Sequence, residues 1–490
     1  MKKRKKNKKF SLSEIIEDEI KLNGLREGFS KNQIKFAKNL RNKNSSKHID
    51  LTAIPFITID GEDSKDFDDA VWCDNNENFS KVMIAIADVS FYVKKNDPID
   101  MEAKKRGNSF YFIDRVIPML PEELSNDLCS LVPNKKRKSI VIEINLKDGI
   151  VKNFKVHRAI IKSVSRLTYE QVENIFLTKD KKNKNFTEIS NLFKTYNILF
   201  KQSEKREKIF FDPDEFKIEL DSKDEILINK KKKLQSYKLI EEFMVLANTV
   251  IAHYFKINKI YSIFRNHEKP KNDKTKLLEG IISQYKLKHS GEFNCQKDFN
   301  EIIKILKKKK ISFLNEYLLK SQSRAIYDTE NKGHFGLSLN NYIHFTSPIR
   351  RYSDLVAHRD LIDFYFFKKK TPKSEVVEHL NFQEKKADSI DRFIFDVAVS
   401  MYLKKFKRNE FKGFVDGIES FGIFIKAIDF PFSGLARFKF RDYNKKNSRK
   451  NIFQDLKIGQ LVTFKIKKIN SRYGKILLES VREFKNYENW

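Results

Sequence analysis

The sequence is poor in residues that cross-link chains, interrupt secondary structure or span membranes. Cys73, Cys129 and Cys295 are the only cysteines and lie far apart, so neither a disulfide framework nor a C-x-x-C zinc pair is indicated. This usage is typical of a reducing compartment, and we expect a cytoplasmic protein. Fifteen glycines and 10 prolines are too few for a collagen-like or Pro/Gly-rich chain. No apolar run approaches the roughly 18 residues of a transmembrane helix, and we expect no membrane partner.

Several motifs of nucleotide and zinc chemistry are missing as well. There is no G-x-x-x-x-G-K-[ST] and no G-x-G-x-x-G, so neither ATP nor a dinucleotide is indicated. His334, His344 and His358 do not have the spacing of a zinc site such as H-E-x-x-H. We interpret these histidines as structural or as groups that position the backbone.

Positive charge is what the chain has in excess. Lys and Arg number 98 and Asp and Glu 66, which gives a net charge of +32 over 490 residues. Such a balance favours a polyanionic partner, although part of it reflects a composition rich in Lys, Asn, Ile and Phe. At 40% hydrophobic residues the chain can bury a large core, and its length predicts two or three domains.

The hydrophobic patterns divide the chain into three parts and predict an α+β fold. Residues 1–48 begin with a lysine-rich arm and continue as a helical lead-in. Residues 49–405 start with strand-like runs and become helical from about residue 165, notably over 239–255 and 376–406. Residues 409–484 contain five short strand-like runs separated by turn signals, which suggest a small β-barrel of the OB type.

An acidic cluster follows the first strand-like run. Five aspartates and one glutamate fall within residues 60–69, although the protein as a whole is strongly basic. Carboxylates packed together repel one another unless cations neutralise them, and all-oxygen ligation suits Mg²⁺ or Mn²⁺. Two such ions can support in-line displacement at a phosphodiester. A solvated acidic loop is the alternative, whereas a calcium loop is disfavoured because Gly61 comes too early and the closing Glu is missing.

Three long blocks carry a resemblance to a known family. TIDGEDSKDFDDAV at 58–71, RGNSFYFIDRVIPMLPEELSNDLCSL at 106–131 and GHFGLSLNNYIHFTSPIRRYSDLVAHR at 333–359 resemble the signatures of the ribonuclease II/ribonuclease R family. The resemblance implies that 49–405 is an RNB catalytic domain, with a mixed β-sheet surrounded by helices. It also implies a hydrolytic, processive 3′→5′ exoribonuclease that uses divalent metal ions to degrade single-stranded RNA to nucleoside 5′-monophosphates.

The same resemblance implies roles for individual residues. Asp60, Asp66, Asp68 and Asp69 match the family's catalytic aspartates and would hold Mg²⁺, with Mn²⁺ as a possible substitute. Asp68 is the position most sensitive to loss. Arg350 matches the catalytic arginine, whose fork suits a phosphate in a charged transition state.

Other residues are predicted to contact RNA. Tyr111 matches the tyrosine that packs against the 3′-terminal nucleotide, and Tyr169 is a second aromatic candidate. Glu241 and Glu242, on a predicted helix, resemble a position that touches the terminal ribose, and Glu242 is the residue assigned to it. Arg351 is expected to contact Asp354 or the RNA backbone. For each aromatic residue, packing in the core is the alternative.

The C-terminal strands resemble an S1 RNA-binding domain. Phe421 and Phe424 flank Gly422 there and are predicted to stack on bases, although an aromatic core is the alternative. The family resemblance is greatest to ribonuclease R members, but only some 48 residues precede the catalytic block. The usual N-terminal cold-shock barrels are therefore expected to be lacking, either because this is a reduced form or because the sequence starts too far downstream. We expect a monomer that acts on single-stranded RNA 3′ ends, with the ribosome or RNA-decay proteins as further possible partners. The competing hypothesis is a non-catalytic RNA-binding protein that retains the RNB fold.

Overall fold

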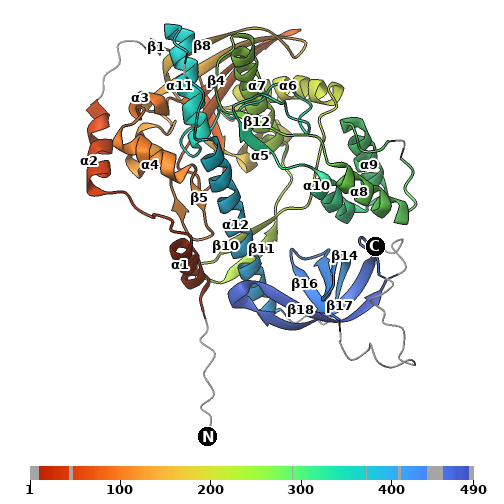
Figure 1. Ribbon diagram of the computed structural model, residues 1–490. Helices are drawn as coiled ribbons and strands as arrows, with labels where there is room; N and C mark the ends of the chain where they lie inside the picture. The colour runs from red at the N-terminus through yellow and green to blue at the C-terminus, as the bar shows by residue number, and fades with distance from the viewer. Residues whose placement is uncertain are drawn as a thin grey trace, which may run out of the picture.

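The protein is described from a computed structural model that covers residues 10–42, 48–289, 291–370, 372–406, 410–438 and 456–484 (Figure 1). The lysine-rich residues 2–9, and Lys439 and Arg441 of the basic loop after residue 438, lie outside these ranges. Among the described helices, none is long and apolar enough to cross a membrane.

The lead-in consists of two short helices, as the sequence predicts. Helix α1 (Leu12–Leu22) and helix α2 (Lys31–Asn39) each begin at a serine that forms a capping box, and η1 (Leu40–Asn42) follows. The apolar face of α1 packs against the long helix α12 (Val377–Lys405) and against a small hairpin formed by β5 (Phe110–Tyr111) and β6 (Val116–Ile117).

A seven-stranded mixed sheet forms the centre of the larger unit. Its strand order is β1-β8-β7-β4-β3-β2-β9. The strands are β1 (Ile49–Asp50), β2 (Ile57–Asp60), β3 (Asp69–Asn76), β4 (Phe79–Ala87), β7 (Lys136–Lys147), β8 (Ile150–Lys162) and β9 (Ser165–Thr168). The central strands bury side chains on both faces, which explains why they appear in the sequence as continuous apolar runs.

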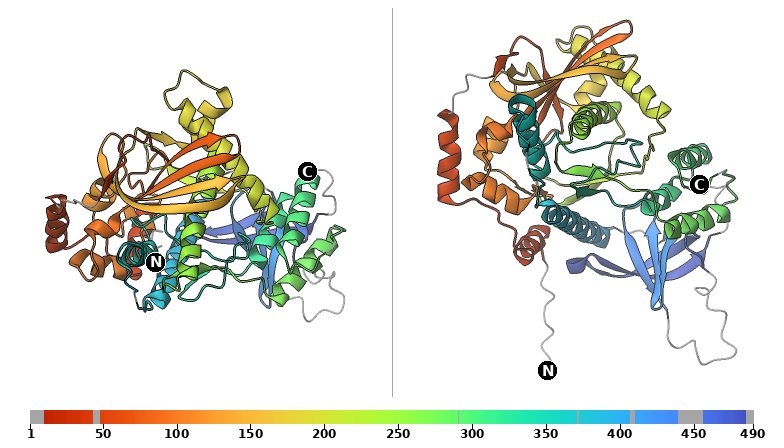
Figure 2. Two further views of the ribbon diagram at one scale, coloured as in Figure 1. Left: turned by 90° about the horizontal axis from the view of Figure 1, so that it is seen from above. Right: turned by 45° about the horizontal axis from the view of Figure 1, so that its top comes forward.

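Helices cover both faces of this sheet (Figures 1 and 2). One hydrophobic cluster joins the sheet to α5 (Tyr169–Thr178), α6 (Phe186–Lys205) and α7 (Gln235–Ile257). The other joins it to α2, α3 (Val89–Tyr92), α4 (Pro98–Arg106) and η2 (Glu123–Leu128), and α11 (Tyr352–Phe367) contributes to both clusters. The helices predicted over 239–255 and 376–406 are confirmed as α7 and α12.

The C-terminal strands close into a barrel in the order β14-β15-β16-β18-β17. They are β14 (Phe411–Glu419), β15 (Gly422–Ala427), β16 (Ser433–Arg437), β17 (Leu461–Asn470) and β18 (Lys475–Glu483), with η6 (Ser471–Tyr473) before the last strand. Phe414 and Leu461 of the barrel share a core with α8 (Asn272–Gln284), α9 (Gln296–Lys309), η3 (Ser312–Leu314) and α10 (Asn315–Ser321). The barrel is therefore packed against the helical part of the molecule.

The half of the chain predicted to be helical also contains two short strand pairs. One joins β10 (Phe216–Leu220) to β11 (Ile226–Lys230), and the other joins β12 (Phe264–Asn266) to β13 (Ile326–Asp328). β12 and β13 are three residues each and are distant in sequence, which is too little pattern for a local prediction.

Candidate active site

The acidic cluster lies at the end of two neighbouring strands. Asp60 is the last residue of β2 and Asp69 is the first residue of β3, and the two strands pair antiparallel through Ile57 and Val71. The loop between them returns the chain to the same edge of the sheet. Asp60 and Asp69 are therefore brought together by the strand pairing, with Asp66 and Asp68 on the connecting loop.

A cavity of about 420 Å³ opens at this edge. The four predicted aspartates line it together with Tyr111, Tyr169, Arg350 and Arg351, which come from β5, α5 and the segment before α11. The fold thus brings together eight predicted site residues that span more than half of the sequence. Glu241 lines the same cavity, whereas Glu242 does not.

Asp68 is the most deeply buried of the four carboxylates, with 5% of its surface exposed. Its Oδ1 accepts a hydrogen bond of 2.8 Å from the backbone N–H of Ile349. Its Oδ2 lies 3.5 Å from Nε of Arg350 and has no hydrogen-bond partner among the described residues. Burial raises the pKa of Asp68 well above its ordinary value, and the Arg350 charge only partly opposes this.

Asp60 and Asp69 also have raised pKa values. Burial is the main cause of both shifts. A like-charged neighbour adds to each of them, because Asp66 raises the pKa of Asp60 and Asp60 raises the pKa of Asp69. Arg350 opposes both shifts but does not cancel them. The site is thus short of positive charge within a strongly basic protein.

This charge deficit and the unpartnered Oδ2 of Asp68 fit a divalent cation. Within the described ranges, however, no three acidic, histidine or cysteine side chains converge closely enough to hold an ion by themselves. A cation at this edge would need water or substrate oxygens to complete its coordination. Mg²⁺ commonly binds in this way, through one or two carboxylates plus water and phosphate oxygens.

The two adjacent arginines have different surroundings. The side chain of Arg350 is 44% exposed, and its Nη2 donates to Oγ of Ser347 at 3.0 Å. Arg351 donates from Nη2 to Oδ1 of Asp354 at 2.8 Å, and this Oδ1 also accepts from the N–H of Ser347 at 2.8 Å. The predicted contact with Asp354 is confirmed. Arg351 therefore shapes the segment from which Arg350 reaches toward the aspartates.

Both predicted tyrosines border the cavity. Tyr111 is 47% exposed, and its hydroxyl donates to Oδ2 of Asp66 at 3.3 Å. The ring of Tyr169 lies against that of Tyr237 with centroids 4.2 Å apart, and Nζ of Lys231 lies 5.0 Å from the Tyr237 ring. Tyr237 was not predicted, because a single tyrosine in the first turn of a helix carries no distinguishing pattern.

The structure does not support the predicted RNA contact of Glu242. This side chain is 4% exposed, and its oxygens accept hydrogen bonds from Oγ of Ser203 and Nζ of Lys208, both at 2.7 Å. Consecutive residues of an α-helix point about 100° apart, so only one of the pair faces the cavity. That residue is Glu241.

The three histidines near the arginine segment make bonds within the protein. His344 borders the cavity and shares a hydrogen bond of 2.9 Å with the hydroxyl of Tyr327, and burial holds its pKa well below the ordinary value. His358 lies 2.8 Å from the carbonyl oxygen of Phe345. Nδ1 of His334 accepts from the N–H of Leu337 at 3.2 Å. These contacts fit the positioning roles expected from the sequence.

The two predicted barrel aromatics lie at the turn between β14 and β15 (Phe421) and in the first half of β15 (Phe424). Phe421 is 49% exposed and Phe424 is half-buried, and their rings meet edge to face with centroids 6.1 Å apart. Lys426 of β15 is paired with Glu316 of α10. The β17 lysines Lys465, Lys467 and Lys468 are exposed.

Comparison with known proteins shows which family the chain belongs to. The sequence model of one family, described as RNB domain, matches residues 48–366. The chain belongs to the RNB family. Ribonuclease R of Buchnera aphidicola subsp. Schizaphis graminum is 36% identical over 419 residues, covering 81% of this chain and 57% of that protein. This RNB protein thus spans less than two thirds of the length of that relative.

Two solved structures of similar fold are described differently, one as a ribonuclease in complex with RNA and the other as a pseudonuclease. Mycoplasma genitalium RNase R in complex with ribose methylated single-stranded RNA has a TM-score of 0.88 and 27% identity, covering 96% of this RNB protein and 78% of that chain. Yeast Ssd1, described as a pseudonuclease, has a TM-score of 0.70 and 18% identity, covering 87% and 55%. The second likeness concerns the fold alone.

Proposed function

We propose that this RNB protein is a hydrolytic, processive 3′→5′ exoribonuclease that degrades single-stranded RNA to nucleoside 5′-monophosphates. The observation that carries the proposal is the convergence of four carboxylates and Arg350 on one cavity, next to two tyrosines. The similarity to ribonuclease R proteins over most of this chain supports the same conclusion.

Asp60, Asp66, Asp68 and Asp69 are the proposed ligands of the divalent metal, with Mg²⁺ as the ion and Mn²⁺ as a substitute. A metal bound there would supply a water of lowered pKa and stabilise the leaving oxygen. The protein itself contributes the acceptors on the strand ends and on the loop. Oδ1 of Asp68 is held by the Ile349 N–H, which leaves Oδ2 directed away from the backbone bond and available as a ligand.

Arg350 is proposed to stabilise the charge that develops on the scissile phosphate. Its guanidinium is half-exposed in the cavity and is tied to the protein through Ser347, so its approach to a phosphate costs little reorganisation. Arg351 is proposed to act by positioning this segment, because its own fork is already engaged by Asp354. Any contact of Arg351 with RNA would be made by atoms of its side chain other than Nη2, which donates to Asp354.

The aromatic residues are proposed to hold the RNA without reading its sequence. Tyr111 and Tyr169 would stack on or pack against the terminal nucleotides, and Glu241 rather than Glu242 would face the terminal ribose. Phe421 and Phe424 would stack on bases further from the 3′ end. The five strands close into a barrel in which β18 lies next to β16 and β17 lies next to β14. This order supports an OB-type barrel related to S1 domains.

These assignments imply a division of labour along the chain. We propose a basic arm and helical lead-in at 1–48, the catalytic domain at 49–405 and the RNA-binding barrel at 409–484. The proposed substrate is the 3′ end of single-stranded RNA, and the protein is proposed to act as a cytoplasmic monomer. The ribosome and RNA-decay proteins remain further partner hypotheses that no described contact supports.

A single-stranded RNA oligonucleotide with a 5′ label, incubated with the protein and Mg²⁺, tests the proposal. We expect a ladder that collapses to a short labelled product, with release of nucleoside 5′-monophosphates. Internal fragments would indicate an endonuclease, and RNA that is shifted in a gel but intact would indicate the non-catalytic alternative. The pseudonuclease of similar fold shows why this test is needed, since fold alone does not establish cleavage.

A further inference from the structure

The hairpin that carries Tyr111 is a very small structure at the edge of the proposed active site. β5 and β6 contribute two residues each, with Phe110 paired to Ile117 and Tyr111 to Val116. Such a short pair has little stability of its own. Tyr111 and Val116 face outward, at 47% and 50% exposure, so the other face of the hairpin must supply its support.

Helix α1 packs against that other face. Phe110 and Ile117 are buried in one hydrophobic cluster with Leu12, Ile15, Ile16 and Ile20 of α1 and with Ile390 and Ile394 of α12. In a strand, alternate side chains point to opposite faces. Phe110 is therefore held by the lead-in while its neighbour Tyr111 faces the cavity.

The tip of the hairpin is tied to the lead-in by charge. Arg115 lies between the two strands, and its guanidinium is 3.2 Å from Glu17 of α1, 2.9 Å from Glu27 and 3.2 Å from Asp114. These hydrogen bonds and charges together raise the pKa of Arg115, with the Glu27 hydrogen bond contributing most. One arginine thus connects the tip to two points of the lead-in.

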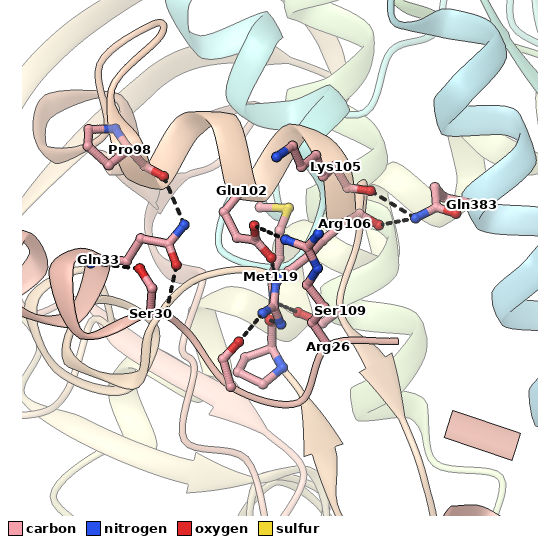
Figure 3. A network of polar contacts seen from close by, with 12 residues as sticks. Arg26, Ser30, Gln33, Pro98, Glu102, Lys105, Arg106, Ser109, Met119 and Gln383 are labelled. Carbon is pink, nitrogen blue, oxygen red and sulfur yellow. Dashed lines mark hydrogen bonds and ion pairs between the residues drawn. The ribbon is translucent and has the colours of Figure 1, made fainter. Parts of the chain in front are cut away.

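The base of the hairpin is tied to the same segment by a second network (Figure 3). Arg106 donates to Glu102 at 3.0 Å, to the carbonyl of Pro118 at 2.9 Å and to the carbonyl of Gly28 at 2.5 Å. Arg26 pairs with the other oxygen of Glu102 at 3.2 Å. Residues 26–28 are therefore bonded directly to α4, before β5, and Arg106 links them to Pro118, after β6.

The hairpin is in turn bonded to both parts of the catalytic cluster. The N–H of Ser109 donates to the carbonyl oxygen of Arg350 at 3.0 Å. Oγ of Ser109 accepts from the N–H of Met119 at 2.9 Å, and Figure 3 shows these two residues. At the other end, the Tyr111 hydroxyl donates to Asp66. A displacement of the hairpin would therefore move the Tyr111 ring relative to Arg350.

We propose that residues 12–29 position the Tyr111 hairpin against the catalytic segment, with Arg115 as the positioning residue. Because Tyr111 is proposed to pack against the terminal nucleotide, a displaced hairpin would release short RNA earlier, so the lead-in also sets where trimming of the 3′ end stops. This inference rests on the proposed function. Arg115 makes no contact with the cavity, so its effect is on the placement of the nucleotide and not on the chemistry at the phosphate.

Arg115→Gln tests the inference, with Arg41→Gln as the matched control. Arg41 also links the lead-in to the catalytic unit through an ion pair, but its partner Asp127 lies in η2, away from the hairpin. For Arg115→Gln we expect KM for single-stranded RNA to rise about threefold to fivefold, as befits a few partly exposed ion pairs, with kcat little changed. The shortest product should become longer. Arg115→Lys should restore part of the wild-type pattern, and Arg41→Gln should match the wild type.

Hydrogen exchange provides a readout that does not need activity. The amides of residues 110–117 should exchange faster in Arg115→Gln than in the wild type, while exchange in the central strands β4 and β7 stays the same. The double variant Glu17→Gln, Glu27→Gln should have the same effect, and combining it with Arg115→Gln should add little.

The outcomes separate this inference from the proposed function. A wild-type protein that does not cleave RNA defeats the proposed function and the trimming claim, while hairpin exchange still decides whether the lead-in supports Tyr111. An active wild type whose Arg115→Gln variant shows unchanged product length and exchange overturns the inference. Equal changes in Arg41→Gln would also overturn it, because the effect would then be a general loosening of the lead-in.

Discussion

The acidic cavity and the surface of the barrel use charge in opposite ways. In the cavity, Asp68 is 5% exposed and burial raises the pKa of Asp60, Asp68 and Asp69. On the barrel, Lys465, Lys467 and Lys468 of β17 are exposed to solvent, and the ring of Phe421 at the turn after β14 is half-exposed. Buried charges interact strongly but only in one geometry, whereas exposed charges are weak, additive and tolerant of a sliding strand. The first arrangement suits chemistry at a phosphate and the second suits retention of RNA.

Replacement of Asp68 should show the difference between the acidic cavity and the barrel most clearly, because cleavage should be lost while RNA binding is kept. In Asp68→Asn the amide oxygen can still accept from Ile349 N–H, so the fold should survive while the metal loses a charged ligand. We expect kcat to fall by about 10³-fold or more, since a bound metal supplies several kcal/mol of transition-state stabilisation. RNA affinity measured by filter binding should stay near the wild-type value. A parallel loss of binding would mean that Asp68 has been assigned the wrong role.

The two arginines provide the next largest contrast. Arg350→Gln should lower kcat by about 10²-fold with little effect on thermal unfolding. The half-exposed guanidinium makes one side-chain hydrogen bond among the described residues, to Ser347, and its ion-pair partner Asp68 can take up a proton when the cation is lost, since burial already raises the Asp68 pKa. Arg351→Gln should instead lower the free energy of unfolding by about 2 kcal/mol, because it leaves the buried Asp354 carboxylate without its cation. Single-turnover cleavage and denaturant unfolding measure these effects. Equal effects of the two variants on kcat and on the free energy of unfolding would contradict these separate roles for Arg350 and Arg351.

The barrel should show a smaller effect, confined to binding. Phe421→Ala removes a proposed stacking platform and should raise KM about fivefold or more, with kcat unchanged, because stacking contributes roughly 1–3 kcal/mol per base. Phe79→Ala is the matched control, since Phe79 is also exposed, at 55%, but lies at the start of β4. Steady-state kinetics with a labelled oligonucleotide compare the two. An equal change in both variants would remove the case for Phe421.

The smallest expected effect is on stability as a function of pH. A carboxylate whose pKa is raised in the folded state destabilises the fold once it ionises, so the stability it contributes is lost as pH rises from about 4 through the folded-state pKa. With a chelator present, Asp69→Asn should therefore raise the unfolding temperature by about 2 °C or more at pH 8 and change it little at pH 4. Mg²⁺ should stabilise the wild type more than the variant at pH 8. If the unfolding temperatures of the wild type and of Asp69→Asn depend on pH in the same way, the cavity does not raise the pKa of Asp69.

Particular elements show how far local patterns reach. Residues 239–255 and 376–406 have strong helical periodicity, and both became helices with boundaries within a few residues of the expectation. The hairpin β5–β6 lies in a strand-like run at 109–120, but each strand has only two residues, and only the tertiary structure shows that Phe110 and Ile117 pack in one cluster with α1. Glu241 and Glu242 are adjacent and chemically equal, and both accept a hydrogen bond from Lys208. Only the orientation of α7 decides that Glu241 lines the cavity and that Glu242 is buried.

The sequence by itself determined which residue types are available for chemistry. The aspartate cluster, the arginine pair after a proline and the basic excess can be seen in the sequence directly. Together with the longer motifs around them they were sufficient to identify the family and to name eight of the residues that line the cavity. Tertiary structure decided which of them meet, since Asp60 and Tyr111 become neighbours of Arg350 only through sheet pairing and through the packing of the lead-in. It also decided which charges are buried. Burial depends on the whole surrounding core, and it is burial that turns ordinary aspartates into carboxylates with raised pKa values in need of a cation.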